Sequence, residues 1–147
     1  MKLPHLIRRF FGSIVAKPLT DAEQTLVGNL LLPRERQLFA EFSRADQRHA
    51  MVVLRRFDAT VPSAATEVRR AALLHDIGKV GLRLGVFSRV LATVVGSRTA
   101  QFAQYHAHES RGLQMLEQAG SSEVTLRVLR GQGDAAIVDA LRNADDT

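Results

Sequence analysis

The segment Ala71-Ala72-Leu73-Leu74-His75-Asp76-Ile77-Gly78-Lys79 decides the fold of this chain, because an apolar helix ends there in an imidazole, a carboxylate and an ammonium group. Neighbouring residues such as His75 and Asp76 point to different faces within a helix. At a helix end the chain can turn so that both side chains approach one ion, and Gly78 supplies the freedom to turn. Alternatively, His75 is a capping or core histidine and Asp76 is a solvated residue at the helix end.

The rest of the sequence has helical periodicity and lacks runs of alternating apolar and polar residues long enough for a sheet. Thr20 and Glu23 have the spacing of a capping box, which predicts a helix that begins near Asp21, and Pro33 is expected to end it. Gly120 predicts the C-terminal cap of another helix. Further helices are expected over residues 34–42, 43–57, 64–75, in the stretch beyond 85, and over 123–130 and 134–145. The predicted fold class is all-α, a helical bundle.

Length and composition favour one globular domain. The chain has 147 residues, of which 46% are hydrophobic and 24% are charged, which is close to globular averages. Residues 1–20 are expected to form an N-terminal amphipathic helix with a linker, and residues 21–147 the helical domain. No apolar run approaches the roughly 20 residues of a membrane span, so a cytoplasmic protein is expected.

The N-terminal segment from Leu3 to Ala16 spaces its apolar residues three or four apart, with Arg8 and Arg9 on the other side. We expect this short amphipathic helix to bury its apolar face against the core or against a second subunit, which leaves a homo-oligomer possible. Contact with a membrane surface is the alternative, and it is not favoured.

Charge and cysteine content restrict the chemistry of any site. The chain has no cysteine, so a metal ion must be held by histidine nitrogen and carboxylate oxygen. The net charge of +5 comes mostly from arginine, but the arginines are scattered, interleaved with acids and not accompanied by aromatic platforms. Nucleic-acid binding is therefore unlikely, whereas a phosphate-bearing small molecule or nucleotide fits such dispersed arginines better.

The stretch Leu73-Leu74-His75-Asp76-Ile77-Gly78-Lys79 resembles the central signature of the HD superfamily of metal-dependent phosphohydrolases. That family has an upstream histidine, the His-Asp pair and a late aspartate. Matching positions here are His49 in Arg48-His49-Ala50 and Asp145 near the end of the last predicted helix. The resemblance implies an HD-like helical bundle in which His49, His75, Asp76 and Asp145 hold a metal ion. Asp139 and Asp146 are the alternatives for the last ligand.

The same resemblance implies a chemistry. One divalent ion (Mn, Fe, Co, Ni or Mg) would activate a water for attack on a nucleotide or other phosphate ester, with Lys79 donating to the phosphate. His108, in a second histidine cluster similar to that of the phosphodiesterase-like branch, is expected in the same pocket. His106 is more consistent with a surface or core position.

The sequence departs from the family pattern at two places, and these departures restrict the expected number of metal ions and the expected activity. Arg130-Gly131-Gln132-Gly133-Asp134 stands where members with several metals have a His-His pair, and the glycine-tyrosine-proline signature of the cyclic-di-GMP phosphodiesterases is absent. One metal is therefore expected, and that specific activity is not. A hydrolase is the preferred interpretation. The alternative is a non-catalytic HD domain that senses a nucleotide or mediates protein contacts.

Overall fold

The computed structural model describes residues 16–80 and 109–146, and this part of the chain is helical with no strand. The elements are α2 (Asp21–Leu30), α3 (Pro33–Ala40), α4 (Arg44–Thr60), α5 (Thr66–Leu74), the 3-10 helix η1 (Ile77–Lys79), a helix over residues 109–118, α8 (Glu123–Leu129) and α9 (Ala135–Asp145). The predicted all-α class is confirmed. The N-terminal segment and the histidine cluster that contains His106 and His108 lie outside the described residues.

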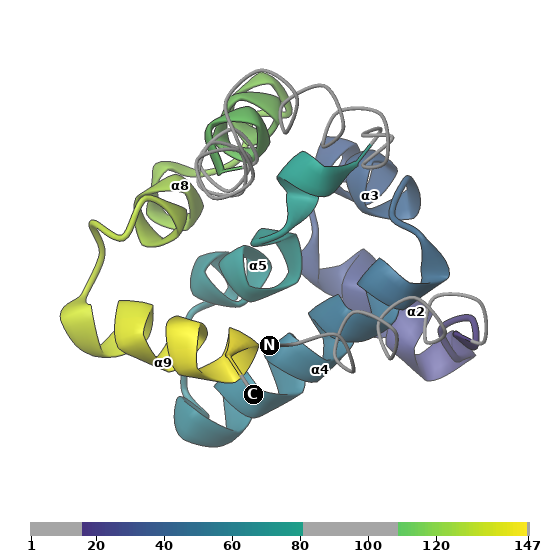
Figure 1. The fold of residues 1–147 in the computed structure, drawn as a ribbon, viewed down its shortest axis with the longest axis horizontal. Coiled ribbons are helices and arrows are strands. Elements are labelled where there is room, and N and C mark those ends of the chain that lie inside the picture. The colour runs from purple at the N-terminus through teal and green to yellow at the C-terminus, as the bar shows by residue number, and fades with distance from the viewer. Residues whose placement is uncertain (1–15, 81–108, 147) are drawn as a thin grey trace, which may run out of the picture.

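Helix α5 lies at the centre of the bundle (Figure 1). It packs on α4 and on α8, while α9 packs on α4. Residues 71–74 are all fully buried, as expected of a final helical turn that is apolar on every side. On α4, Leu54 and Phe57 are equally buried. This packing fixes the C-terminal end of α5, and with it His75 and Asp76, inside the bundle.

Local capping signals set most helix boundaries as predicted. Thr20 and Glu23 form the capping box at the start of α2, and Ser43 caps α4 by accepting from the Asp46 amide. Gly120 takes the left-handed backbone conformation after the helix over 109–118, with φ of 78°. Asp134 likewise caps α9 through its side chain. These termini form because each motif provides partners for its own end groups.

Several helix boundaries differ from prediction, including the end of α3, which lies at Ala40 rather than 42. Pro33 does not close α2, which ends at Leu30, but is the first residue of α3, a position where proline loses no hydrogen bond. Helix α4 continues past Phe57 to Thr60. Helix α5 spans Thr66–Leu74 rather than 64–75.

Gly78 lies within η1, opposite a glycine of the helix over residues 109–118. A Cβ on Gly112 would lie 3.0 Å from the backbone nitrogen of Gly78, which is tighter than most real Cβ contacts. A side chain at residue 112 would therefore require the Gly78 backbone to shift by a few tenths of an ångström. This contact holds the segment after Asp76 against the rest of the bundle.

The buried Glu23 and its partner Arg48 connect the segment before α2 to helix α4. Glu23 accepts from Arg48, with 2.8 Å between Oε1 and Nη1, and from Arg55. Arg48 also donates to the carbonyl oxygens of Lys17 and Pro18. Leu19 is part of the hydrophobic core. Residues 17–19, which were assigned to a linker, are thus packed onto the helical domain.

Glu23 should make stability depend on acid pH. The Thr20 backbone amide, helped by Arg48, lowers the pKa of Glu23 from 4.5 to about 2 against the opposing effect of burial. A carboxylate with a lowered pKa stabilises the fold above about pH 4.5, and this contribution is lost as the pH falls toward 2. We expect Glu23→Gln to be less stable than the parent at pH 7 by about 1–2 kcal/mol, allowing for solvent screening of the exposed Arg55. The difference should shrink at pH 2.5.

Equilibrium denaturation in urea at both pH values measures this difference. Glu117→Gln is the matched control, because Glu117 pairs with Arg130 at the surface. Parallel pH profiles for the parent and Glu23→Gln would contradict the assignment.

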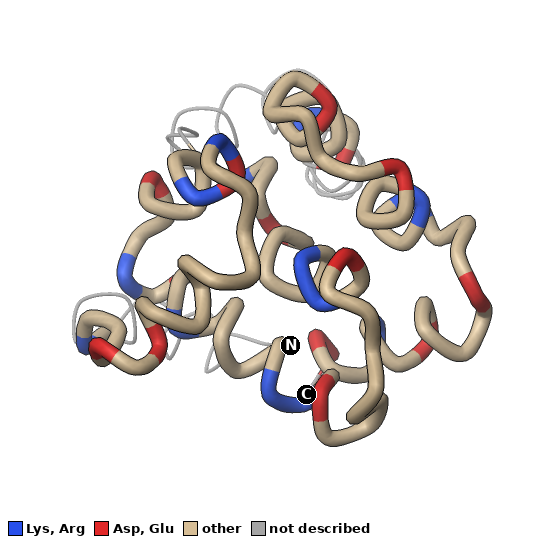
Figure 2. Tube along the Cα trace, turned by 180° about the vertical axis from the view of Figure 1, so that it is seen from behind, with Lys and Arg blue, Asp and Glu red and all other residues tan. Residues whose placement is uncertain are grey.

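Basic and acidic residues are interspersed along the described part of the backbone (Figure 2). Several arginines have partners within the fold: Arg69 makes two hydrogen bonds to Asp58, and Arg130 pairs with Glu117 and Glu123. Much of the arginine charge in this part of the chain is therefore compensated locally. Among the described residues, no helix has the length and apolar character needed to cross a membrane.

Candidate metal centre

Four side chains from three parts of the fold meet at one end of α5. His49 comes from α4, His75 and Asp76 from the end of α5, and Asp145 from the last turn of α9. One ligand atom each from His49, His75 and Asp76 lie within 4.8 Å of one another. Oδ1 of Asp145 lies 2.9 Å from Nε2 of His49 and 3.2 Å from Nε2 of His75. The structure thus brings together all four residues predicted as metal ligands.

The backbone after α5 makes this convergence possible. His75 keeps a helical conformation, with φ of −57° and ψ of −31°, whereas Asp76 leaves it, with φ of −101° and ψ of 11°. The two side chains would diverge on a regular helix, yet Nε2 of His75 lies 3.6 Å from Oδ2 of Asp76. The turn is made by Asp76 rather than by Gly78, which has no positive φ.

The imidazole of His75 is oriented by the helix that precedes it. Its Nδ1 lies 2.8 Å from the carbonyl oxygen of Ala72, which can only accept, so Nδ1 carries the hydrogen in the neutral ring. Nε2 is left facing the cluster, where it is buried and has no hydrogen bond of acceptable geometry. A buried nitrogen lone pair beside two carboxylates is the arrangement of a metal-binding histidine whose other nitrogen is fixed by a carbonyl.

The charges of the cluster favour a cation. Burial opposes protonation of His75, but the Asp145 and Asp76 carboxylates outweigh it and raise the pKa of the imidazole. The hydrogen bond with His49 and the close contact with the His75 imidazole hold the pKa of Asp145 well below its usual range. The Asp145 carboxylate therefore remains ionised beside the two imidazoles, and it stabilises positive charge there, either as a proton on a ring or as a bound ion.

Lys79 forms an ion pair with one of the predicted metal ligands, a contact that was not predicted. Its Nζ lies 2.6 Å from Oδ2 of Asp76, the oxygen that also faces His75 and, at 3.9 Å, His49. The predicted contact of Lys79 was with substrate. In the structure it is a counterion of a predicted metal ligand, because an ionised carboxylate that is mostly buried requires a partner.

The late carboxylate that meets the histidines is Asp145. Asp139 lies six residues earlier on α9, with a side chain that is 69% exposed and 3.9 Å from Arg142. Asp146 follows the helix as its C-cap and is exposed. His108, the other predicted pocket residue, lies outside the described residues.

Sequence reasoning missed Arg56, which extends from α4 to the residue before Asp145. Its Nη1 donates to the carbonyl oxygen of Ala144, the neighbour of Asp145, at 3.2 Å. The signal available was spacing, because Arg56 follows His49 by seven residues and so lies on the same face of the helix.

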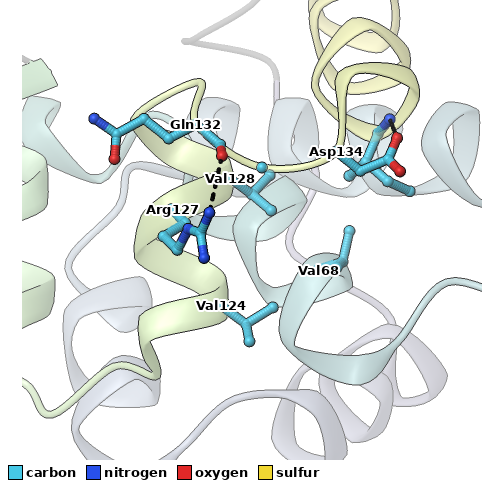
Figure 3. A pocket seen from close by; sticks show the side chains of 8 residues that line it. Val68, Val124, Arg127, Val128, Gln132 and Asp134 are labelled. Atoms are coloured by element: carbon cyan, nitrogen blue, oxygen red, sulfur yellow. Dashed lines mark hydrogen bonds between the residues drawn. The ribbon is translucent and has the colours of Figure 1, made fainter.

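A separate cavity of about 420 Å³ lies between α5, α8 and α9 (Figure 3). Half of its lining residues are valine or isoleucine, and the guanidinium of Arg127 donates to the carbonyl oxygen of Gln132. The lining residues are Val68, Val124, Arg127, Val128, Gln132, Gly133, Asp134 and Ile137. None of the four clustered residues lines it, so the cavity and the histidine cluster are different places in the fold.

Comparisons with protein-family models, curated proteins and solved structures gave no match. The chemical assignment therefore depends on the residues of this chain. The cluster of His49, His75 and Asp76 could hold a metal ion, and Asp145 lies in direct contact with both of its histidines.

Proposed function

We propose that this protein is a metal-dependent phosphohydrolase of the HD type, acting on a nucleotide or another phosphate ester. One observation carries the proposal: the Nε2 of His75 is buried, makes no hydrogen bond of acceptable geometry, and faces His49, Asp76 and Asp145. The resemblance of the segment around His75 to the HD signature supports the same chemistry.

The donor set fits a divalent ion. Two imidazole nitrogens and two carboxylate oxygens suit Mn²⁺, Fe²⁺, Co²⁺ or Ni²⁺, and suit Mg²⁺ less well because it prefers oxygen. His49, His75, Asp76 and Asp145 would hold the ion. When bound, such an ion lowers the pKa of a coordinated water and offsets charge on a phosphoryl group.

Contacts with neighbouring groups orient these four side chains and set the charge around them. The Ala72 carbonyl fixes the tautomer of His75, so that Nε2 rather than Nδ1 faces the centre. Asp145 contacts both imidazoles and so connects the end of α9 to α4 and to the end of α5. Lys79 keeps an ammonium group beside Asp76, where it adds a donor for a phosphate oxygen next to the ion.

A screen of phosphate substrates tests the proposal. Purified protein loaded with Mn²⁺ is assayed against nucleoside mono-, di- and triphosphates and against bis(p-nitrophenyl) phosphate, with metal content measured in every sample. We expect hydrolysis of at least one substrate by the parent. His75→Ala should lose metal and activity together, because it removes a ligand at the centre of the cluster. Activity that survives in His75→Ala would disprove the site assignment.

The second candidate is a non-catalytic HD domain that binds a nucleotide or a protein partner. The ion pairs within the cluster favour it, because Lys79 already compensates Asp76 and the histidines compensate Asp145 without any ion. Full Mn²⁺ occupancy without hydrolysis of any substrate would support this candidate over the enzyme.

A further inference from the structure

The last turn of α9 carries Asp145, the fourth residue of the cluster. The contacts that hold the Asp145 carboxylate in place must therefore be identified. The Asp145 side chain is 42% exposed, so the surrounding protein does not confine it by burial. The carbonyl groups of a final helical turn also lack partners within the helix. Here the amide of Asp146 bonds to the Arg142 carbonyl, but this contact does not reach Ala144 or Asp145.

Arg56 provides the partner for this turn. Its Nη1 donates to the Ala144 carbonyl at 3.2 Å, and the Ala144 side chain is buried against the core. A cationic donor at a helix C-terminus bonds a free carbonyl and also interacts favourably with the helix dipole. The backbone on one side of Asp145 is thereby attached to α4.

The helix that supplies Arg56 also supplies His49. Two successive residues of α9 are thus held by one face of α4: Ala144 through its carbonyl to Arg56, and Asp145 through its carboxylate to His49. We propose that Arg56 is a positioning residue, which places the Asp145 carboxylate relative to the two imidazoles. This inference rests on the metal site of the proposed function and adds a determinant of its geometry.

Substitution of Arg56 separates this role from a general contribution to folding. Arg56→Met removes the donor while keeping much of the aliphatic stem, and Arg56→Lys retains one cationic donor. Residues that orient metal ligands typically change affinity by about 10–100-fold. We expect Arg56→Met to weaken Mn²⁺ binding about tenfold in isothermal titration calorimetry, toward the lower end of that range, and Arg56→Lys to recover at least half of the loss on a logarithmic scale.

Arg55→Met is the matched control. It removes the same charge from the adjacent position of α4, but Arg55 pairs with Glu23 rather than with α9. Its Mn²⁺ affinity should equal that of the parent even if its melting temperature falls. Equal weakening of Mn²⁺ binding in Arg55→Met and Arg56→Met would overturn the proposal, because loss of charge or stability would then suffice.

A double substitution tests whether Arg56 acts through Asp145. In an Asp145→Asn background, Arg56→Met should cause no further loss of Mn²⁺ affinity, because the carboxylate that it positions has gone. An undiminished tenfold loss in that background would mean that Arg56 acts by another route.

An NMR measurement on the metal-free protein distinguishes failure of this inference from failure of the metal site. Arg56→Met should lower the amide order parameter of Asp145 from about 0.85 toward 0.6, whereas Arg55→Met should not. If the parent binds no Mn²⁺ but this loss of order occurs, the proposed metal site fails and the positioning of Asp145 stands. An unchanged order parameter in Arg56→Met would overturn the positioning role whether or not the parent binds Mn²⁺.

Discussion

Asp76→Ala is expected to abolish the stabilisation of this protein by divalent metal. At an Mn²⁺ concentration of one hundred times Kd, binding should stabilise the parent by about 2.7 kcal/mol, which raises the melting temperature by roughly 5–10 °C for a domain of this size. Asp76 lies within ligand-sharing distance of both histidines, so its removal leaves too few donors in the cluster. Differential scanning calorimetry with Mn²⁺ and with a chelator measures the effect.

Asp139→Ala is the control for the loss of a carboxylate. Asp139 is on α9 but exposed and away from the histidines, so this variant should keep the full response to metal. A chelator response in Asp76→Ala equal to that of the parent would mean that the ion binds elsewhere in the chain.

Lys79→Ala is expected to reduce turnover by about 10–100-fold while metal content stays at the level of the parent. A hydrogen bond to a charged group is worth about 1.5–3 kcal/mol, and this magnitude corresponds to the expected loss if the ammonium donates to the phosphate in the transition state. Removing the ammonium also frees Oδ2 of Asp76 from a competing cation, so metal should not bind more weakly. Steady-state kinetics on the best substrate of the screen, with metal analysis of the same samples, measures both quantities.

Lys17→Ala removes the same charge from an exposed position whose contact with α4 is made by its backbone carbonyl, so its kinetics should match the parent. Lys79→Arg should recover part of the activity. Loss of metal together with activity in Lys79→Ala would show that Lys79 maintains the ligand geometry of Asp76 instead of contacting substrate.

The parts of the fold that were predictable from the sequence depend on neighbouring residues. Thr20 with Glu23, Ser43 and Gly120 each provide partners or backbone freedom for the helix end beside them, so a short window contains the whole cause. Pro33 shows the limit of such reasoning, because a proline that cannot continue one helix can equally begin the next.

Contacts between distant segments were not predictable in this way. Glu35 is fully buried and accepts from Ser121, 86 residues later, and nothing near Glu35 in the sequence identifies that partner. The assembly of His49 with Asp145 was expected only from the resemblance to the HD signature, since helical periodicity does not say which helices meet. Arg56 was overlooked because its partner is a backbone carbonyl, which has no residue type to recognise.

The contact between His49 and Asp145 spans 96 residues, whereas α4 and α5 follow one another in the sequence. The entropic cost of closing a loop rises with the logarithm of its length, and contacts between near neighbours therefore tend to form first during folding. His49, His75 and Asp76 would then meet while α9 is still undocked. In that order of folding, the second carboxylate would reach the centre last, and with it the charge that Asp145 adds.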